Sequence, residues 1–221
     1  MRTTNTPLRI ALVGDQGFVR EALSVVIATR TPHSVVLEVA NDRGYGKLFE
    51  TMGPPDVTLV DLTQHPEDGI ARIVWLGANQ PTTKPLACGH MLAKQWVRRA
   101  LVAGSRGYVA LNGALDEVPL ALEQLWSGVH YSSPLVLAVR EEIAATARER
   151  GKVQAAISPR ELEVLQLVFD AAELSYKRIA DKLHIGSRTV ESHMRSLYQK
   201  LGVKTRTGVL LIALRSGLLE L

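Results

Sequence analysis

The hydrophobic residues of the first 130 positions occur in short apolar runs that alternate with stretches of helical spacing. Short apolar runs predict buried strands, and apolar residues three or four positions apart predict the helices that cover them. The expected strands are Leu8–Gly14, Ser34–Ala40, Val57–Leu62, Lys84–Cys88 and Gly107–Leu111, and the expected helices are Phe18–Thr29, Lys94–Ala103 and Asp116–Ser127. This alternation indicates an α/β domain with a parallel five-stranded sheet, in which function gathers at the carboxyl ends of the strands.

The last 65 residues show helical spacing throughout and predict a second, all-α domain of four short helices. Ser158 is a capping residue, Pro159 suits the first helical position, and Glu161 completes a capping box. Ser175 and Ser187 are expected to cap the second and third helices. The expected core positions of the first three helices are Leu162, Val164, Leu165, Val168, Ile179, Ala180, Leu183, Val190, Met194, Leu197 and Leu201.

The third of these helices has a polar face turned away from the core. Glu191, Ser192, Arg195 and Gln199 lie opposite its apolar residues, and Gly202 ends it. A helix, a short turn and a second helix with a polar outer face form the helix-turn-helix arrangement that binds the DNA major groove. The alternative is a small helical bundle whose charged side chains are only solvated.

Charge and composition support the first interpretation and set the compartment. Residues 151–221 contain 11 Lys and Arg against 7 Asp and Glu, whereas residues 1–150 contain 15 of each. The net charge of +4 therefore lies in the C-terminal part, as DNA binding requires. The single cysteine, Cys88, excludes an internal disulfide, and no apolar run is long enough for a membrane span, so a cytoplasmic protein is expected.

The segment between the two domains is polar and rich in alanine. Residues 140–156 are expected to form the end of a helix that runs into a flexible linker, with the boundary near Gly151. The expected division is therefore a first domain over 1–130, a helical end and linker over 131–156, and a helix-turn-helix domain over 157–221.

Four motifs in the C-terminal part occur in order: Ser-Pro-Arg-Glu-x-Glu-Val-Leu from Ser158, Lys-x-Ile-Ala-x-x-Leu from Lys177, Thr-Val-x-x-His from Thr189, and Lys-Leu-Gly-Val from Lys200. With them the segment 157–218 resembles the LuxR/NarL-type DNA-binding domain of bacterial transcription regulators. It departs from that family at Glu173, where a glycine is usual.

The resemblance implies roles for the polar residues around the third helix. Glu191, Ser192 and Arg195 occupy base-reading positions, at which Arg195 could bind a guanine and Glu191 a cytosine amino group. The residues placed for phosphate contacts are Lys177, Ser187, Arg188, Thr189, His193 and Lys200. A solvated helix face is the alternative for Lys177 and Lys200, and Tyr198 could contact the DNA backbone or pack inside.

The fourth helix carries an apolar stripe of Val209, Leu210, Ala213 and Leu214. As in the family, this stripe suggests a contact between two copies of the chain, which would then bind a roughly palindromic site. The alternative is that Leu210 and Leu214 belong to the core of the domain.

The N-terminal part, over residues 8–128, resembles the receiver domain of two-component response regulators. Asp61 ends the third expected strand in the phosphoacceptor position, and Asp15 is one of the family's acidic pair. However, Gly14 replaces the other acid, Gly89 or Cys88 replaces the hydroxyl residue, and Leu111 replaces the lysine. Asp15 and Asp61 could bind Mg²⁺ weakly, but a phosphoryl group would lack the partners that switch a receiver.

Other candidate chemistry is sparse. The histidines show no metal-ligand pair at helical spacing, and His90 near Cys88 fits a loop histidine beside a half-buried thiol better than a nucleophile pair. No enzyme is expected. The interpretation is a homodimeric regulator that binds double-stranded DNA, with an atypical receiver controlled by protein contacts or a small ligand. The alternatives are a conventional response regulator phosphorylated at Asp61 and an interaction protein that heterodimerises with another regulator.

Overall fold

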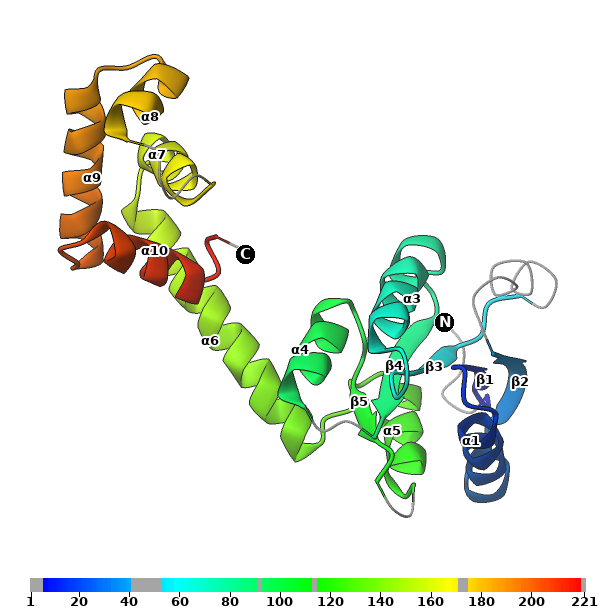
Figure 1. Cartoon of the computed structure of the whole chain (residues 1–221). Helices are drawn as coiled ribbons and strands as arrows, with labels where there is room; N and C mark the ends of the chain where they lie inside the picture. Colours follow the sequence, from blue (N-terminus) through cyan, green and yellow to red (C-terminus); the bar gives the residue numbers. More distant parts are fainter. Residues whose placement is uncertain (1–5, 41–52, 91–92, 113–114, 171–174, 220–221) are drawn as a thin grey trace. The chain divides into compact units, whose positions relative to one another are not determined.

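The computed structural model describes residues 6–40, 53–90, 93–112, 115–170 and 175–219. The chain forms two compact units, Met1–Arg140 and Glu141–Leu221. Figure 1 shows the α/β unit at the N-terminal end of the chain and the helical unit at the C-terminal end.

The first unit is built on a parallel sheet of five strands. These are β1 (Arg9–Val13), β2 (Ser34–Val39), β3 (Val57–Asp61), β4 (Lys84–Gly89) and β5 (Tyr108–Ala110), in the spatial order β2-β1-β3-β4-β5. All five predicted strands and the parallel α/β class are confirmed. Strand order reverses between β1 and β3, and in such sheets ligands bind outside the carboxyl ends of the strands at this point.

Helices cover both faces of the sheet. Helix α1 (Gly17–Arg30) packs beside α5 (Glu117–Trp126), and α3 (Pro66–Asn79) packs beside α4 (Lys94–Val102), on the other side in Figure 1. Helix α3 is not among the predicted helices, because the two glycines inside it obscure its helical pattern. Pro66 at its start and the acidic residues Glu67 and Asp68 in its first turn were the signals that could have revealed it.

The predicted flexible linker is helical instead. Helix α6 runs without interruption from Pro134 to Ala156 and passes through Gly151, where the boundary was expected. The compact units divide after Arg140. Alanine, glutamate and arginine are strong helix formers, and together they outweigh the cost of about 1 kcal/mol for one glycine in the helix.

The second unit contains α7 (Pro159–Asp170), α8 (Tyr176–Leu183), α9 (Ser187–Leu201) and α10 (Arg206–Arg215). Its core is formed by the predicted apolar residues, among which Val164, Leu165, Val168, Val190 and Leu197 are fully buried. The four-helix prediction is therefore confirmed. Glu173, the departure from the family pattern, lies outside the described residues.

Candidate DNA-binding surface and receiver site

A capping box and a partly buried ion pair fix the start of α7. Ser158 Oγ accepts a hydrogen bond from the Glu161 N–H at 3.3 Å, and Glu161 Oε2 accepts one from the Ser158 N–H at 2.6 Å. Lys200 Nζ, at the end of α9, donates to the same carboxylate at 2.7 Å. Burial alone would raise the pKa of Glu161, but the hydrogen bonds from Lys200, Ser158 and Ser196 lower it to about 2.

This ion pair changes the interpretation of Lys200. The sequence motifs placed it at a DNA phosphate, whereas in the structure its ammonium group neutralises a side chain that is only 5% exposed. Glu161 and Lys200 are 39 positions apart, so no local pattern connects them. Lys200 thus holds α9 against α7, an arrangement that sets the orientation of the polar helix.

A tight turn joins α8 to α9. Ser175 caps α8 as predicted, because its Oγ accepts from the Arg178 N–H, and His184 ends the helix in the left-handed conformation with φ of 52°. The residue that caps α9 is Gly186, not Ser187 as predicted, and Ser187 is the first helical residue. Gly186 adopts the extended cap conformation and its carbonyl accepts from the Thr189 N–H.

The predicted base-reading residues share the solvent-facing side of α9. Glu191, Ser192 and Arg195 are exposed, whereas Val190 and Met194 on the opposite side are buried. Of the residues expected at phosphates, Lys177, Arg188 and Thr189 are exposed and Ser187 and His193 are half-buried. The helix therefore presents an exposed polar row, Glu191, Ser192 and Arg195, that does not pack against the domain core.

Tyr198, whose position the sequence left open, packs inside. It lies against the core of the second unit, and its hydroxyl is 3.4 Å from the hydroxyl of Tyr176. Burial, followed by the hydrogen bond to Tyr198, raises the pKa of Tyr176 to about 12. The pair links α8 to α9.

The predicted dimer stripe on α10 is wrong in part. Val209 and Ala213 are fully buried in the core of their own domain, so they cannot meet a second copy. Leu210 and Leu214 are half-buried and pack against the same core, which was the stated alternative. The exposed apolar side chain of this helix is Leu211, at 48% exposure. The helix is apolar on several faces, so spacing alone could not tell core from surface.

The receiver site lies at the carboxyl ends of β1 and β3. Asp61 ends β3, is 8% exposed, and its Oδ1 accepts hydrogen bonds from the N–H and the hydroxyl of Thr63 at 2.9 and 2.5 Å. A Cβ on Gly14 would come within 2.5 Å of the Asp61 Cβ. The Gly14 backbone and the Asp61 side chain are thus packed closely where the family has the first acid of its pair. Asp15 forms a long ion pair of 3.9 Å with the buried Arg72.

The neighbouring strands end in residues without a hydroxyl or an amine. A Cβ on Gly89, at the end of β4, would come within 2.9 Å of the Tyr108 hydroxyl, and Leu111, just after β5, is 2% exposed. Burial and the nearby Asp61 raise the pKa of the Cys88 thiol well above its usual range. A buried thiol that resists ionisation is not a nucleophile, so the rejected Cys88–His90 pair gains no support.

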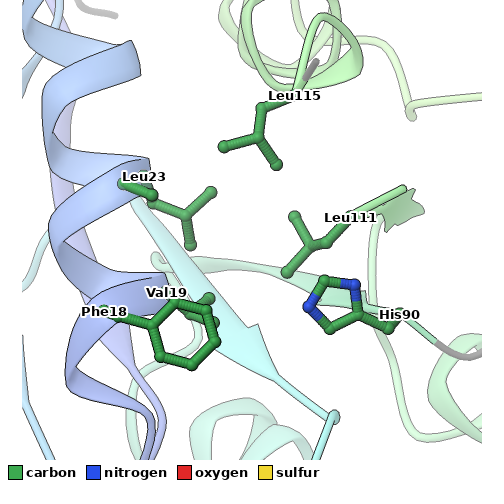
Figure 2. A pocket seen from close by; sticks show the side chains of 7 residues that line it. Phe18, Val19, Leu23, His90, Leu111 and Leu115 are labelled. Carbon is green, nitrogen blue, oxygen red and sulfur yellow. The ribbon is translucent and has the colours of Figure 1, made fainter. Parts of the chain in front are cut away.

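An apolar pocket of about 190 Å³ lies beside this site. Phe18, Val19 and Leu23 enter it from α1, and Leu111, Leu115 and His90 face them (Figure 2). His90 supplies the one ionisable side chain of the lining. Leu111 thus contributes to an apolar wall at the place where a receiver of the usual type carries its lysine.

No group of three or more potential metal-ligating side chains occurs among the described residues. Within the same part of the chain, no helix is both long and apolar enough to cross a membrane.

Comparison with known proteins shows what the chain is similar to. The family model of bacterial regulatory proteins of the LuxR family matches residues 155–213. The C-terminal domain is thus similar to the regulatory domain of that family. The oxygen regulatory protein NreC of Staphylococcus aureus is 28% identical over 220 residues, which cover 96% of this chain and all of the relative.

Solved structures extend the likeness to the whole response regulator architecture. A structure of the Salmonella typhimurium RcsB response regulator has a TM-score of 0.56 at 22% identity and covers 93% of this chain and 97% of its own. A LuxR-family two-component response regulator from Aurantimonas sp. SI85-9A1 has a TM-score of 0.56 at 26% identity, covering 63% of this chain and 99% of its own. RcsB has also been solved as a complex with DNA, with a TM-score of 0.56, 22% identity and 95% coverage of this chain.

Proposed function

We propose that this protein is a cytoplasmic, sequence-specific transcription regulator. It uses α9 to bind double-stranded DNA, and it binds as a homodimer. The observation that carries the proposal is the exposed row of Glu191, Ser192 and Arg195, which lies opposite the buried face of the helix. A guanidinium in the major groove can bind guanine through two hydrogen bonds, and a carboxylate can accept from cytosine. RcsB dimers bound to DNA offer a precedent for the two-fold arrangement.

Paired substitutions test this assignment. Arg195→Ala should weaken binding to the cognate site by about 1–3 kcal/mol and relax one base position. Lys177→Ala removes a charge from another exposed position and should weaken cognate and random DNA alike, reducing the salt dependence by about one unit. The measurement is DNA affinity at several salt concentrations. Equal effects of both substitutions on cognate and random DNA would refute base reading by Arg195.

We further propose that the receiver is controlled through protein contacts or a small ligand and not through phosphorylation. Three features support this. The Asp61 carboxylate is occupied by Thr63, Gly14 leaves a single acid beside it, and Leu111 faces an apolar pocket. A phosphoryl group at Asp61 would find neither the hydroxyl nor the cation that normally moves the domain between its two states.

A small phosphodonor with Mg²⁺ should therefore change DNA affinity by less than about threefold, or ~0.7 kcal/mol. Phosphate incorporation is followed by mass spectrometry, and Asp61→Asn serves as the control without an acceptor. The rival is a conventional response regulator, which the position of Asp61 at the end of β3 favours. Stoichiometric labelling of Asp61 together with a large gain in DNA affinity would establish that rival.

A further inference from the structure

A cluster of cationic side chains surrounds His130, at the end of the sheet opposite Asp61. Lys84 begins β4, Arg106 lies shortly before β5, His130 follows α5, and Arg140 lies in α6. All four belong to the first compact unit. The proposed DNA-binding function makes no use of them.

The contacts of the His130 ring are not compatible with one another as hydrogen bonds. Arg106 Nη1 lies 2.9 Å from Nε2, and Arg140 Nη2 lies 3.0 Å from Nδ1. A guanidinium only donates, a neutral imidazole has one accepting nitrogen, and a protonated imidazole has none. At most one of the two contacts can therefore be a hydrogen bond, whichever form the ring takes.

Besides Nη2, which contacts the His130 ring, Arg140 has a second nitrogen that lacks a good hydrogen-bond acceptor. Its Nε is shielded from solvent and makes no hydrogen bond with any described residue. Its Nη2 reaches the Arg106 carbonyl only at 3.5 Å. A buried donor without a partner costs on the order of 1–3 kcal/mol, so the cluster contains more donors than the protein supplies acceptors.

A hollow of about 160 Å³ opens onto three side chains of the cluster, Lys84, Arg106 and His130. Its lining consists of Lys84, Arg106, Leu125, Gly128, Val129 and His130, none of which is acidic. Lys84 Nζ is held at the hollow by a hydrogen bond of 2.7 Å to the Leu125 carbonyl. Since one water occupies roughly 30 Å³ of liquid, the space suits a single tetrahedral oxyanion with a few waters.

We propose that this hollow binds a small tetrahedral oxyanion of the phosphate type, held by Arg106 and protonated His130, with Lys84 and Arg140 adding positive charge. Such an anion accepts hydrogen bonds from Arg106 and from the His130 Nε2–H at once. It therefore removes the conflict at Nε2 and offsets part of the excess positive charge. This inference does not depend on the proposed DNA-binding function.

The protonation of His130 follows the anion. Burial, and then the charges of Arg140, Arg106 and Lys84, lower the pKa of His130, so the ring is neutral at neutral pH without an anion. Glu123 of α5 lines an adjoining hollow together with His130 and is the acidic group on that side. A bound anion offsets the three cations and raises the pKa, so binding takes up a proton, and affinity falls as the pH rises.

Calorimetry of the full chain with sulfate tests the proposal, since sulfate does not change its own protonation near neutral pH. Titrations in two buffers with different ionisation heats should show one saturable site and proton uptake. Arg106→Ala should lower the affinity about tenfold or more, because it removes charge-assisted hydrogen bonds. Arg150→Ala, at an exposed position of α6, should leave it unchanged.

His130→Gln provides the discriminating variant, because glutamine keeps a donor and an acceptor but cannot take up a proton. It should bind sulfate more weakly and without proton uptake, and this result stands even if Arg106→Ala unfolds. Equal sulfate affinity in the wild type and in His130→Gln, or no saturable binding at all, would overturn the proposal. Competition by inorganic phosphate and by a small phosphate monoester then distinguishes a free anion from a phosphorylated metabolite.

Discussion

The partly buried ion pair between Glu161 and Lys200 makes the stability of the C-terminal domain depend on pH. The carboxylate has a pKa of about 2 in the folded chain against an ordinary value of 4.5. The difference corresponds to about 3 kcal/mol of stabilisation of the ionised form. Because the pKa is lowered on folding, this stabilisation is fully present above pH 4.5 or so and is lost as the pH falls towards 2.

Glu161→Gln isolates this contribution. Glutamine can still accept from the Ser158 N–H, so the capping box survives while the charge is lost. The Glu161 side chain is 5% exposed, but its partner Lys200 is 36% exposed, so solvent screens the ion pair in part. We therefore expect the free energy of unfolding of the C-terminal domain to fall by less than the full difference, about 1–2 kcal/mol, at pH 7. The deficit should shrink towards zero near pH 2, where the wild-type carboxyl is also neutral.

Urea denaturation followed by two signals gives the measurement. The three tryptophans, Trp75, Trp96 and Trp126, all lie in the first unit, so their fluorescence reports the receiver alone. Circular dichroism at 222 nm reports both units, and the difference isolates the helical domain.

Glu163→Gln is the matched control for this experiment. Glu163 pairs with Arg160 on the exposed side of the same helix, where an ion pair contributes less than about 0.5 kcal/mol. A deficit in Glu161→Gln that stays constant between pH 7 and pH 3 would show that the loss is steric and would refute the electrostatic argument.

Two further pairs of substitutions test the packing around the sites. Val209→Asp should unfold the C-terminal domain at a cost of roughly 3 kcal/mol or more, whereas Leu211→Asp at the exposed position should leave its circular dichroism unchanged. A folded Val209→Asp protein with weakened self-association would instead support the predicted dimer contact of α10. Gly14→Ala should destabilise the receiver by about 1–3 kcal/mol because its Cβ meets the Asp61 Cβ, while Gly77→Ala in open space on α3 should stabilise it by up to about 1 kcal/mol. The unfolding transition detected by fluorescence measures both, and an unchanged stability of Gly14→Ala would show that the site is not tightly packed.

Local patterns predicted the elements well because their determinants are local. The capping box at Ser158, the cap at Ser175 and the glycine at the end of α9 each act within a few residues, and the structure confirms all three. The parallel sheet followed from apolar runs of strand length. The predicted cap at Ser187 was wrong by one position, since a glycine with an extended backbone can begin a helix without a side-chain hydrogen bond.

Features that join distant parts of the chain could not be predicted in the same way. The Glu161–Lys200 pair, the burial of Val209 and Ala213, and the cluster around His130 depend on how helices and loops meet in space. The linker failed for another reason. A polar, alanine-rich sequence is compatible with both coil and helix, and its composition does not distinguish them when apolar residues such as Val153 become buried.

The turn between α8 and α9 limits which residues evolution can place at position 184. His184 has an exposed side chain, so no packing contact selects it, but its backbone lies at a φ of 52°. Glycine and asparagine adopt this conformation readily, whereas valine and isoleucine are strongly disfavoured there. The substitutions tolerated at this surface position are therefore limited by the backbone conformation from which α9 leaves the turn. A substitution of one exposed side chain at position 184 can change the direction of α9, and with it DNA recognition, without altering any residue that contacts DNA.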